Sequence, residues 1–123
     1  MSKRIGNILE AGQARYGSGS TVNTYQREAS QLAGKLEQSG QKVDWSRIDF
    51  AVVSKMAQTG KFTARQLGDA LLKASPCLSQ RHEGNEAQYA LRTIEAVLRM
   101  VPGAAEAVLK AAKAAERVLS LGR

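Results

Sequence analysis

Apolar residues recur at three- and four-residue intervals along most of this chain, and glycine or proline residues separate the segments that carry them. Before Gly40, for example, Tyr25, Ala29 and Ala33 follow this spacing. The interval matches one face of an α-helix, and no segment alternates apolar and polar residues as a half-buried strand would. We therefore predict an all-α fold, a compact bundle of five to six helices. The predicted helices cover residues 22–38, 45–59, 64–74, 85–100 and 102–120, with a short turn at Ser75-Pro76.

The length and the polar runs suggest how the chain is organised. The chain has 123 residues, which is enough for one helical core and too few for a second. Residues 1–20 end in the run Gly17-Ser18-Gly19-Ser20 and are predicted to be a linker or flexible segment. Residues 21–123 are predicted to form the helix-bundle domain. The apolar face expected on its last helix consists of Ala105, Val108, Leu109, Ala112, Ala115, Val118 and Leu119.

The net charge of +7 points to a polyanion as the partner. Lysine and arginine side chains near phosphates release condensed counterions, which favours binding to nucleic acid. The excess is spread along the chain, so a basic domain with solvated charges is the alternative. Cys77 is the single cysteine, the first residues of the sequence lack the apolar run typical of a secretory signal, and no apolar run is long enough to span a membrane. A cytoplasmic protein is expected.

A catalytic centre is not expected in this chain. His82 is the single histidine, so neither a zinc site nor a nucleophile–histidine pair built on Cys77 has support in the local sequence. No glycine-rich phosphate loop is present. Asp44 and Asp49 lie five residues apart near a predicted helix start, where capping is the expected role for both. No metal ligands are predicted.

The connection between the second and third predicted helices is the first candidate binding region. Gly60 separates the two helices, and Lys61, Thr63 and Arg65 lie at the beginning of the second one. Free amides at a helix N-terminus bind phosphate readily. The same layout is typical of a helix-turn-helix, in which Ala64 to Ala74 would enter a DNA major groove. An ordinary helix corner with solvated charges is the third interpretation.

The polar loop before the fourth long helix is the second candidate region. We expect Arg81, His82, Tyr89 and Arg92 to gather around this loop. A cation beside an aromatic ring suits a single strand, because the cation meets phosphate while the ring stacks on a base. The alternative is that Tyr89 belongs to the core and Arg92 extends along it.

A longer string of residues resembles a known family. It consists of Asp49-Phe50, Gly60, Ala74-Ser75-Pro76, Arg81, Gly84, Glu86, Tyr89 and Arg92-Thr93, within residues 44–98. In order and nearly in spacing, it resembles the C-terminal helix-bundle domain of plasmid primases of the RepB-prime type. In mobilisable plasmids that primase is often the C-terminal part of a MobA relaxase polyprotein. The matching core covers somewhat under half of this chain.

The resemblance implies an accessory role beside a primase catalytic domain, which holds the metal-binding carboxylates in that family. It implies contact with single-stranded template DNA and with an initiating nucleotide such as ATP. The motif residues assigned to this contact are Ser75, Arg81, Tyr89, Arg92 and Thr93. On charge and placement alone we add Lys55, Lys61, Arg65 and Lys73. A non-catalytic, monomeric domain that binds single-stranded DNA and works with a primase catalytic domain is expected.

Two other functions remain open. One is duplex-DNA binding through the helix-turn-helix layout described above. The other is docking of a protein partner on the last helix, because its small residues Ala105, Ala112 and Ala115 would allow close helix approach. That alanine-rich helix is also longer and more regular than the family pattern leads us to expect.

Overall fold

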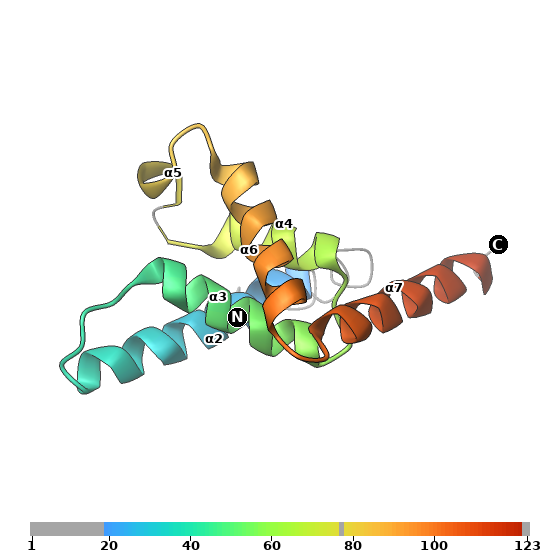
Figure 1. The fold of residues 1–123 in the computed structure, drawn as a ribbon, viewed down its shortest axis with the longest axis horizontal. Helices are drawn as coiled ribbons and strands as arrows, with labels where there is room; N and C mark the ends of the chain where they lie inside the picture. The colour runs from blue at the N-terminus through green and yellow to red at the C-terminus, as the bar shows by residue number, and fades with distance from the viewer. Residues whose placement is uncertain (1–18, 77, 122–123) are drawn as a thin grey trace, which may run out of the picture.

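The regular structure of the described residues is entirely helical. The computed structural model describes residues 19–76 and 78–121. The helices are α2 (Gly19–Gln38), α3 (Trp45–Gln58), α4 (Ala64–Ala74), α5 (Leu78–Arg81), α6 (Glu86–Met100) and α7 (Ala104–Leu121) (Figure 1). The all-α prediction is thus confirmed. Helix α2 already includes Gly19 and Ser20, and the rest of the predicted flexible segment lies outside the described residues.

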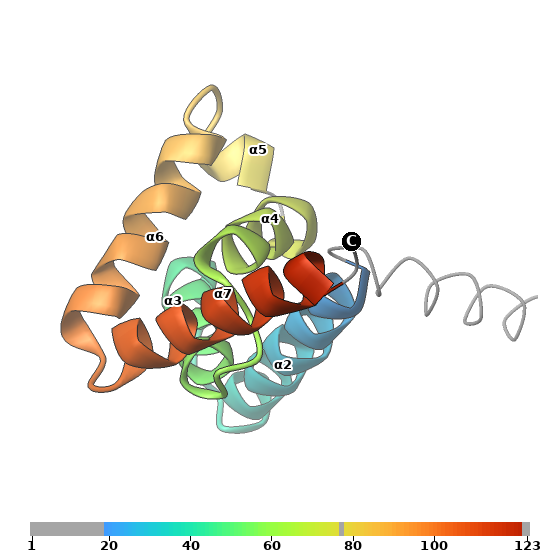
Figure 2. The same cartoon turned by 90° about the vertical axis from the view of Figure 1, so that its right-hand side faces the viewer.

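Helix α3 lies at the centre of the packing. It contacts α2, α4, α6 and α7, while α4 also packs between α2 and α6. The C-terminal part of α7 extends beyond the other helices (Figure 1), and Figure 2 shows α5 and the beginning of α6 at the opposite end of the domain from α2. The central helices contribute the fully buried side chains Val52, Val53, Met56, Leu67 and Leu71. None of the helices in the described ranges is long and apolar enough to cross a bilayer.

Local side-chain chemistry explains where the central helices begin and end. The Asp44 carboxylate accepts hydrogen bonds from the first backbone amides of α3 and caps that helix. Thr63 and Gln66 form a reciprocal capping box at the beginning of α4. Gly60 and Gly84 have φ angles of +73° and +78°, a region in which glycine avoids the clash of a Cβ atom. These signals make the predicted bounds of α3, α4 and α6 accurate to about one or two residues.

The apolar face expected on the last helix is only partly confirmed. Helix α7 buries Ala104, Val108 and Ala111. Of the residues expected on its apolar face, Val108 is buried, whereas Ala105 and Ala115 are exposed and the Leu109 side chain is 55% exposed. The helix starts after Gly103, which has a φ of +81°, and its many alanines leave the apolar face poorly marked in the sequence. The side chains of Val118 and Leu119, and residue Cys77, lie outside the described part of the chain.

Candidate nucleic-acid interface

A buried carboxylate organises the end of the domain where α3, α5 and α6 meet. Asp49 lies on the inner face of α3 and is fully buried. Its Oδ1 accepts a hydrogen bond of 2.6 Å from the Tyr25 hydroxyl of α2. Its Oδ2 accepts from the Ser75 hydroxyl at 2.8 Å and from the Tyr89 hydroxyl at 2.7 Å. A buried charge is tolerated when it is paired and hydrogen-bonded, and these contacts meet that condition. Asp49 therefore ties four segments of the chain together.

Arg81 supplies the countercharge, and its guanidinium is directed into the domain. Its Nη2 lies 3.4 Å from Asp49 Oδ2 and donates to the Ser75 hydroxyl at 2.6 Å. Its Nε donates to the carbonyl oxygen of Pro76 at 3.2 Å, and its Nη1 donates to the Ser46 hydroxyl at 3.4 Å. The side chain is 22% exposed. Most of its donors are thus engaged in holding the α4–α5 connection against α3.

Tyr89 and His82 form a stacked aromatic pair at the outer side of this network. Their ring centroids lie 3.9 Å apart with an interplanar angle of 17°, and the Arg81 guanidinium carbon lies 5.8 Å from the centre of the Tyr89 ring. Burial and the hydrogen bond to Asp49 raise the pKa of Tyr89. Burial, followed by the charge of Asp49, raises the pKa of Tyr25 more strongly. Both phenols remain protonated donors at neutral pH, so the Tyr89 ring is held in place.

A recess of about 240 Å³ opens beside the stacked pair. We call it the aromatic recess. Its lining residues are His82, Asn85, Gln88, Tyr89 and Arg92. It lies at the N-terminal end of α6, where the helix dipole places partial positive charge. Asn85 occupies the N-cap position but makes no side-chain capping hydrogen bond. The recess therefore combines an aromatic wall, two amide side chains and a cation.

The structure brings some of the predicted residues together and uses others internally. Arg81, His82, Tyr89 and Arg92 do gather around one loop, as predicted. Ser75 and Thr93 are 7% and 8% exposed, and the Thr93 hydroxyl donates to the carbonyl oxygen of Tyr89. In this conformation neither side chain is placed for direct contact with a nucleic acid.

The lysines and the remaining arginine predicted on charge lie elsewhere. Lys55 forms an ion pair of 2.7 Å with Glu28. Lys55 and Lys61 line a second recess of about 310 Å³ between α2 and the α3–α4 connection. Arg65 and Lys73 are exposed on α4, and neither lines this recess or the aromatic recess. The basic residues therefore do not form a single cluster.

Sequence reasoning assigned the wrong role to Asp49. Asp44 caps α3 as predicted, whereas Asp49 is the centre of the buried network and caps nothing. The available signal was its phase, because Asp49 falls on the same face of α3 as Val52, Val53 and Met56. The amides Asn85 and Gln88 of the aromatic recess were also missed, since nothing in their spacing distinguishes them from solvated polar residues.

The described residues contain no cluster of three or more histidine, cysteine, aspartate or glutamate side chains suited to a metal ion. The Asp49 carboxylate is fully buried and accepts hydrogen bonds from Tyr25, Ser75 and Tyr89, so it does not face an open site. The Ser75 hydroxyl that donates to Asp49 is itself buried, at 7% exposure. The open part of the site offers an aromatic face and a cation, an arrangement suited to an anion with a planar ring.

Comparisons with known proteins find matches to the region of the chain that contains this site. Residues 43–97 match the family model of the RepB DNA-primase C-terminal helical domain. A relative, Mobilization protein A of Escherichia coli, is 38% identical over 69 residues, which is 56% of this chain. The match spans 9% of the length of that relative. No solved structure matches. The Asp49 network and the aromatic recess are both built largely within the matched residues, and the two matches support a RepB/MobA-type primase C-terminal domain in this part of the chain.

Proposed function

We propose that this chain is a non-catalytic module that holds single-stranded template DNA for a primase catalytic domain during primer initiation. The observation that carries the proposal is the aromatic recess, in which the stacked His82–Tyr89 pair lies beside Arg92. A base of the strand stacks on the aromatic pair, and Arg92 binds a neighbouring phosphate. The net charge of +7 adds a general attraction for a polyanion.

The Asp49 network supports this proposal by making the recess rigid. Tyr89 is held through its hydroxyl, so its ring loses little freedom when a base stacks on the pair. Arg81 acts in the proposal as a positioning residue, because its guanidinium is engaged with Asp49 and Ser75. Its positive charge still lies near the recess and attracts phosphate at longer range.

The size of the recess favours a DNA strand over a free initiating nucleotide. Its volume of about 240 Å³ is below the roughly 300–1,000 Å³ of typical small-molecule pockets, so it fits a base and an adjacent phosphate better than a whole triphosphate. We therefore propose the DNA strand as the main ligand. ATP is a second ligand that strengthens strand binding by contacting the strand end or the N-terminus of α6.

Helix packing makes the helix-turn-helix function the weaker candidate. A recognition helix must project far enough to enter a major groove. Helix α4 is instead flanked by α2 and α6, and it buries Leu67, Ala70 and Leu71. In the following test, a preference for duplex DNA would favour the helix-turn-helix function over the proposal.

The test measures fluorescence anisotropy of labelled single-stranded and duplex oligonucleotides at several salt concentrations, with and without ATP. Arg92→Ala is expected to lower the magnitude of the salt slope by about 0.7, the value for one lost phosphate contact on a single strand. His82→Ala is expected to weaken binding by about 1–3 kcal/mol and leave the slope unchanged, because stacking displaces no counterions.

The matched control is Arg99→Ala, which removes an exposed cation from the other end of the same helix. It is expected to change affinity much less than Arg92→Ala. Wild-type affinity in both recess variants, or a clear preference of the wild type for duplex, would overturn the proposal. Circular dichroism of each variant checks that the helix content is retained.

A further inference from the structure

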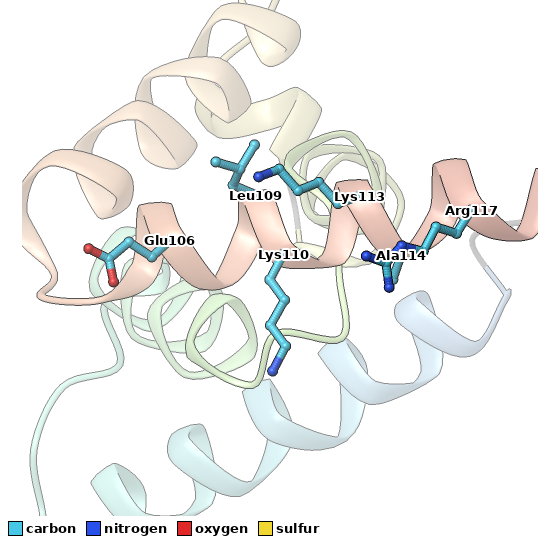
Figure 3. Close-up of a pocket in the computed structure, with 6 residues that line it drawn as sticks. All are labelled: Glu106, Leu109, Lys110, Lys113, Ala114 and Arg117. Carbon is cyan, nitrogen blue, oxygen red and sulfur yellow. The ribbon is translucent and has the colours of Figure 1, made fainter.

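Helix α7 presents a basic groove that the proposed strand contact at the aromatic recess does not use. The groove has a volume of about 430 Å³, and we call it the α7 groove. Its lining residues are Glu106, Leu109, Lys110, Lys113, Ala114 and Arg117 (Figure 3). The described lining thus carries three cations and one carboxylate. The other acidic residue of α7, Glu116, is not part of this lining.

The three cations follow the axis of the helix. Lys110, Lys113 and Arg117 are spaced by three and four residues, so they lie along one side over about 10 Å at 1.5 Å per residue. All three are exposed, since α7 packs on the domain through its other face, at Ala104, Val108 and Ala111. Figure 3 shows Lys110 directed toward the α3–α4 connection, whereas Lys113 reaches back toward Leu109.

Lys110 brings the α7 groove close to the α3–α4 connection, which carries a further cation. A Cβ atom placed on Gly60 would lie 4.0 Å from the Lys110 side chain and 3.8 Å from the carbonyl oxygen of Ala107, so Lys110 extends along the α3–α4 connection. The next residue in that connection is Lys61, which lines the second recess together with Arg27. Lys110 of α7 therefore lies close to the segment that carries Lys61.

We propose that the α7 groove and Lys61 form a second contact for the nucleic-acid backbone, separate from the aromatic recess. The inference rests on the proposed function, because it gives the same strand a second point of attachment. Charge complementarity identifies the ligand: lysine and arginine side chains at regular spacing fit consecutive phosphates, and the described residues that line the groove include no aromatic ring on which a base would stack. This surface therefore holds the strand without reading its bases.

The test compares the wild type with the triple variant Lys110→Ala/Lys113→Ala/Arg117→Ala on a single strand of about 30 nucleotides, longer than the roughly 4–16 nucleotides of a typical single binding site. Alanine keeps helix propensity, so the fold of α7 is expected to survive. We expect the magnitude of the salt slope to fall by about 2, at about 0.7 for each lost phosphate contact.

A matched triple variant controls for the change in net charge. Lys35, Lys42 and Arg99 are exposed and line neither recess nor the α7 groove. Replacing these three with alanine is expected to change the salt slope much less than the α7 variant does. Equal effects of the two triple variants, or no effect of the α7 variant, would overturn the inference.

Two further outcomes separate this inference from the proposed function. If His82→Ala and Arg92→Ala weaken binding while the α7 variant binds as the wild type does, the recess stands and the second contact is wrong. If the α7 variant keeps its affinity for DNA but loses binding to polyglutamate, the groove serves an acidic protein and the inference is overturned. Absence of DNA binding by the wild type would overturn both.

Discussion

Replacing Asp49 with alanine is expected to be the most destabilising single change in the polar part of this domain. The carboxylate accepts hydrogen bonds from Tyr25, Ser75 and Tyr89 and forms the ion pair with Arg81. A hydrogen bond to a charged group contributes about 1.5–3 kcal/mol, so simple addition of four contacts would give about 6–12 kcal/mol.

The structure reduces that sum. Arg81 and Ser75 keep their bond to each other at 2.6 Å, and the partly exposed Arg81 and Tyr89 side chains can turn toward water. Tyr25 is fully buried, so its hydroxyl is left without a partner in the core. Loss of one partner of a buried ion pair costs about 3–5 kcal/mol, and we expect a decrease in the free energy of unfolding of that size.

Urea denaturation followed by far-ultraviolet circular dichroism measures this free energy. Asp44→Ala is the control, because it removes an exposed carboxylate from the same helix and costs about 1 kcal/mol as a lost N-cap. Asp49→Asn keeps the shape but turns an NH2 group toward hydroxyl donors, which should cost about 1–3 kcal/mol. If Asp49→Ala costs no more than Asp44→Ala, the network does not hold the domain together as argued.

Three further changes test the local arguments. Thr63→Ala removes the capping box of α4 and should lower the free energy of unfolding by about 0.5–2 kcal/mol in the same assay; an unchanged value would contradict the cap. Gly84→Ala should lower the free energy of unfolding by about 1–2 kcal/mol. The cost comes from the φ of +78° alone, because no atom lies within 4 Å of the added Cβ. A neutral effect would show that the turn is remodelled. The pKa of Tyr25 is raised in the folded state, so the Tyr25 hydroxyl loses its proton at a lower pH in the unfolded chain. This difference alone should lower the wild-type free energy of unfolding by about 1.4 kcal/mol per pH unit above about pH 10. Tyr25→Phe removes this group, so its stability should decline less steeply with pH; equal slopes for the two proteins would refute the assignment.

The helices could be predicted from the sequence where specific residues mark both the ends and the apolar face. Asp44, Thr63 and Gly60 define the ends of α3 and α4, and large aliphatic side chains define the buried faces between them. Helix α7 lacks such marks, because alanine is compatible with either a buried or an exposed position. Its rotation is decided by tertiary contacts of Ala104 and Val108, which no local pattern reveals.

The candidate site could be predicted only in part. The gathering of Arg81, His82 and Tyr89 around one loop followed from their residue types and their closeness in the chain. The role of Asp49 did not, because its partner Tyr25 lies 24 residues earlier and only the packing of α2 on α3 brings the two together. The buried charge of Asp49 also explains why Arg81 points inward, a direction that charge and spacing alone leave open. DNA binding by these residues stays a prediction.

The most direct test of the proposed function is a titration of the isotope-labelled chain with a short single strand, followed by backbone amide NMR shifts. The proposal predicts that the largest shifts fall on residues 82–92, around His82, Gln88 and Arg92 in the aromatic recess. Shifts concentrated instead on Ala64–Ala74, and larger with duplex than with single strand, would contradict it and assign the DNA contact to α4.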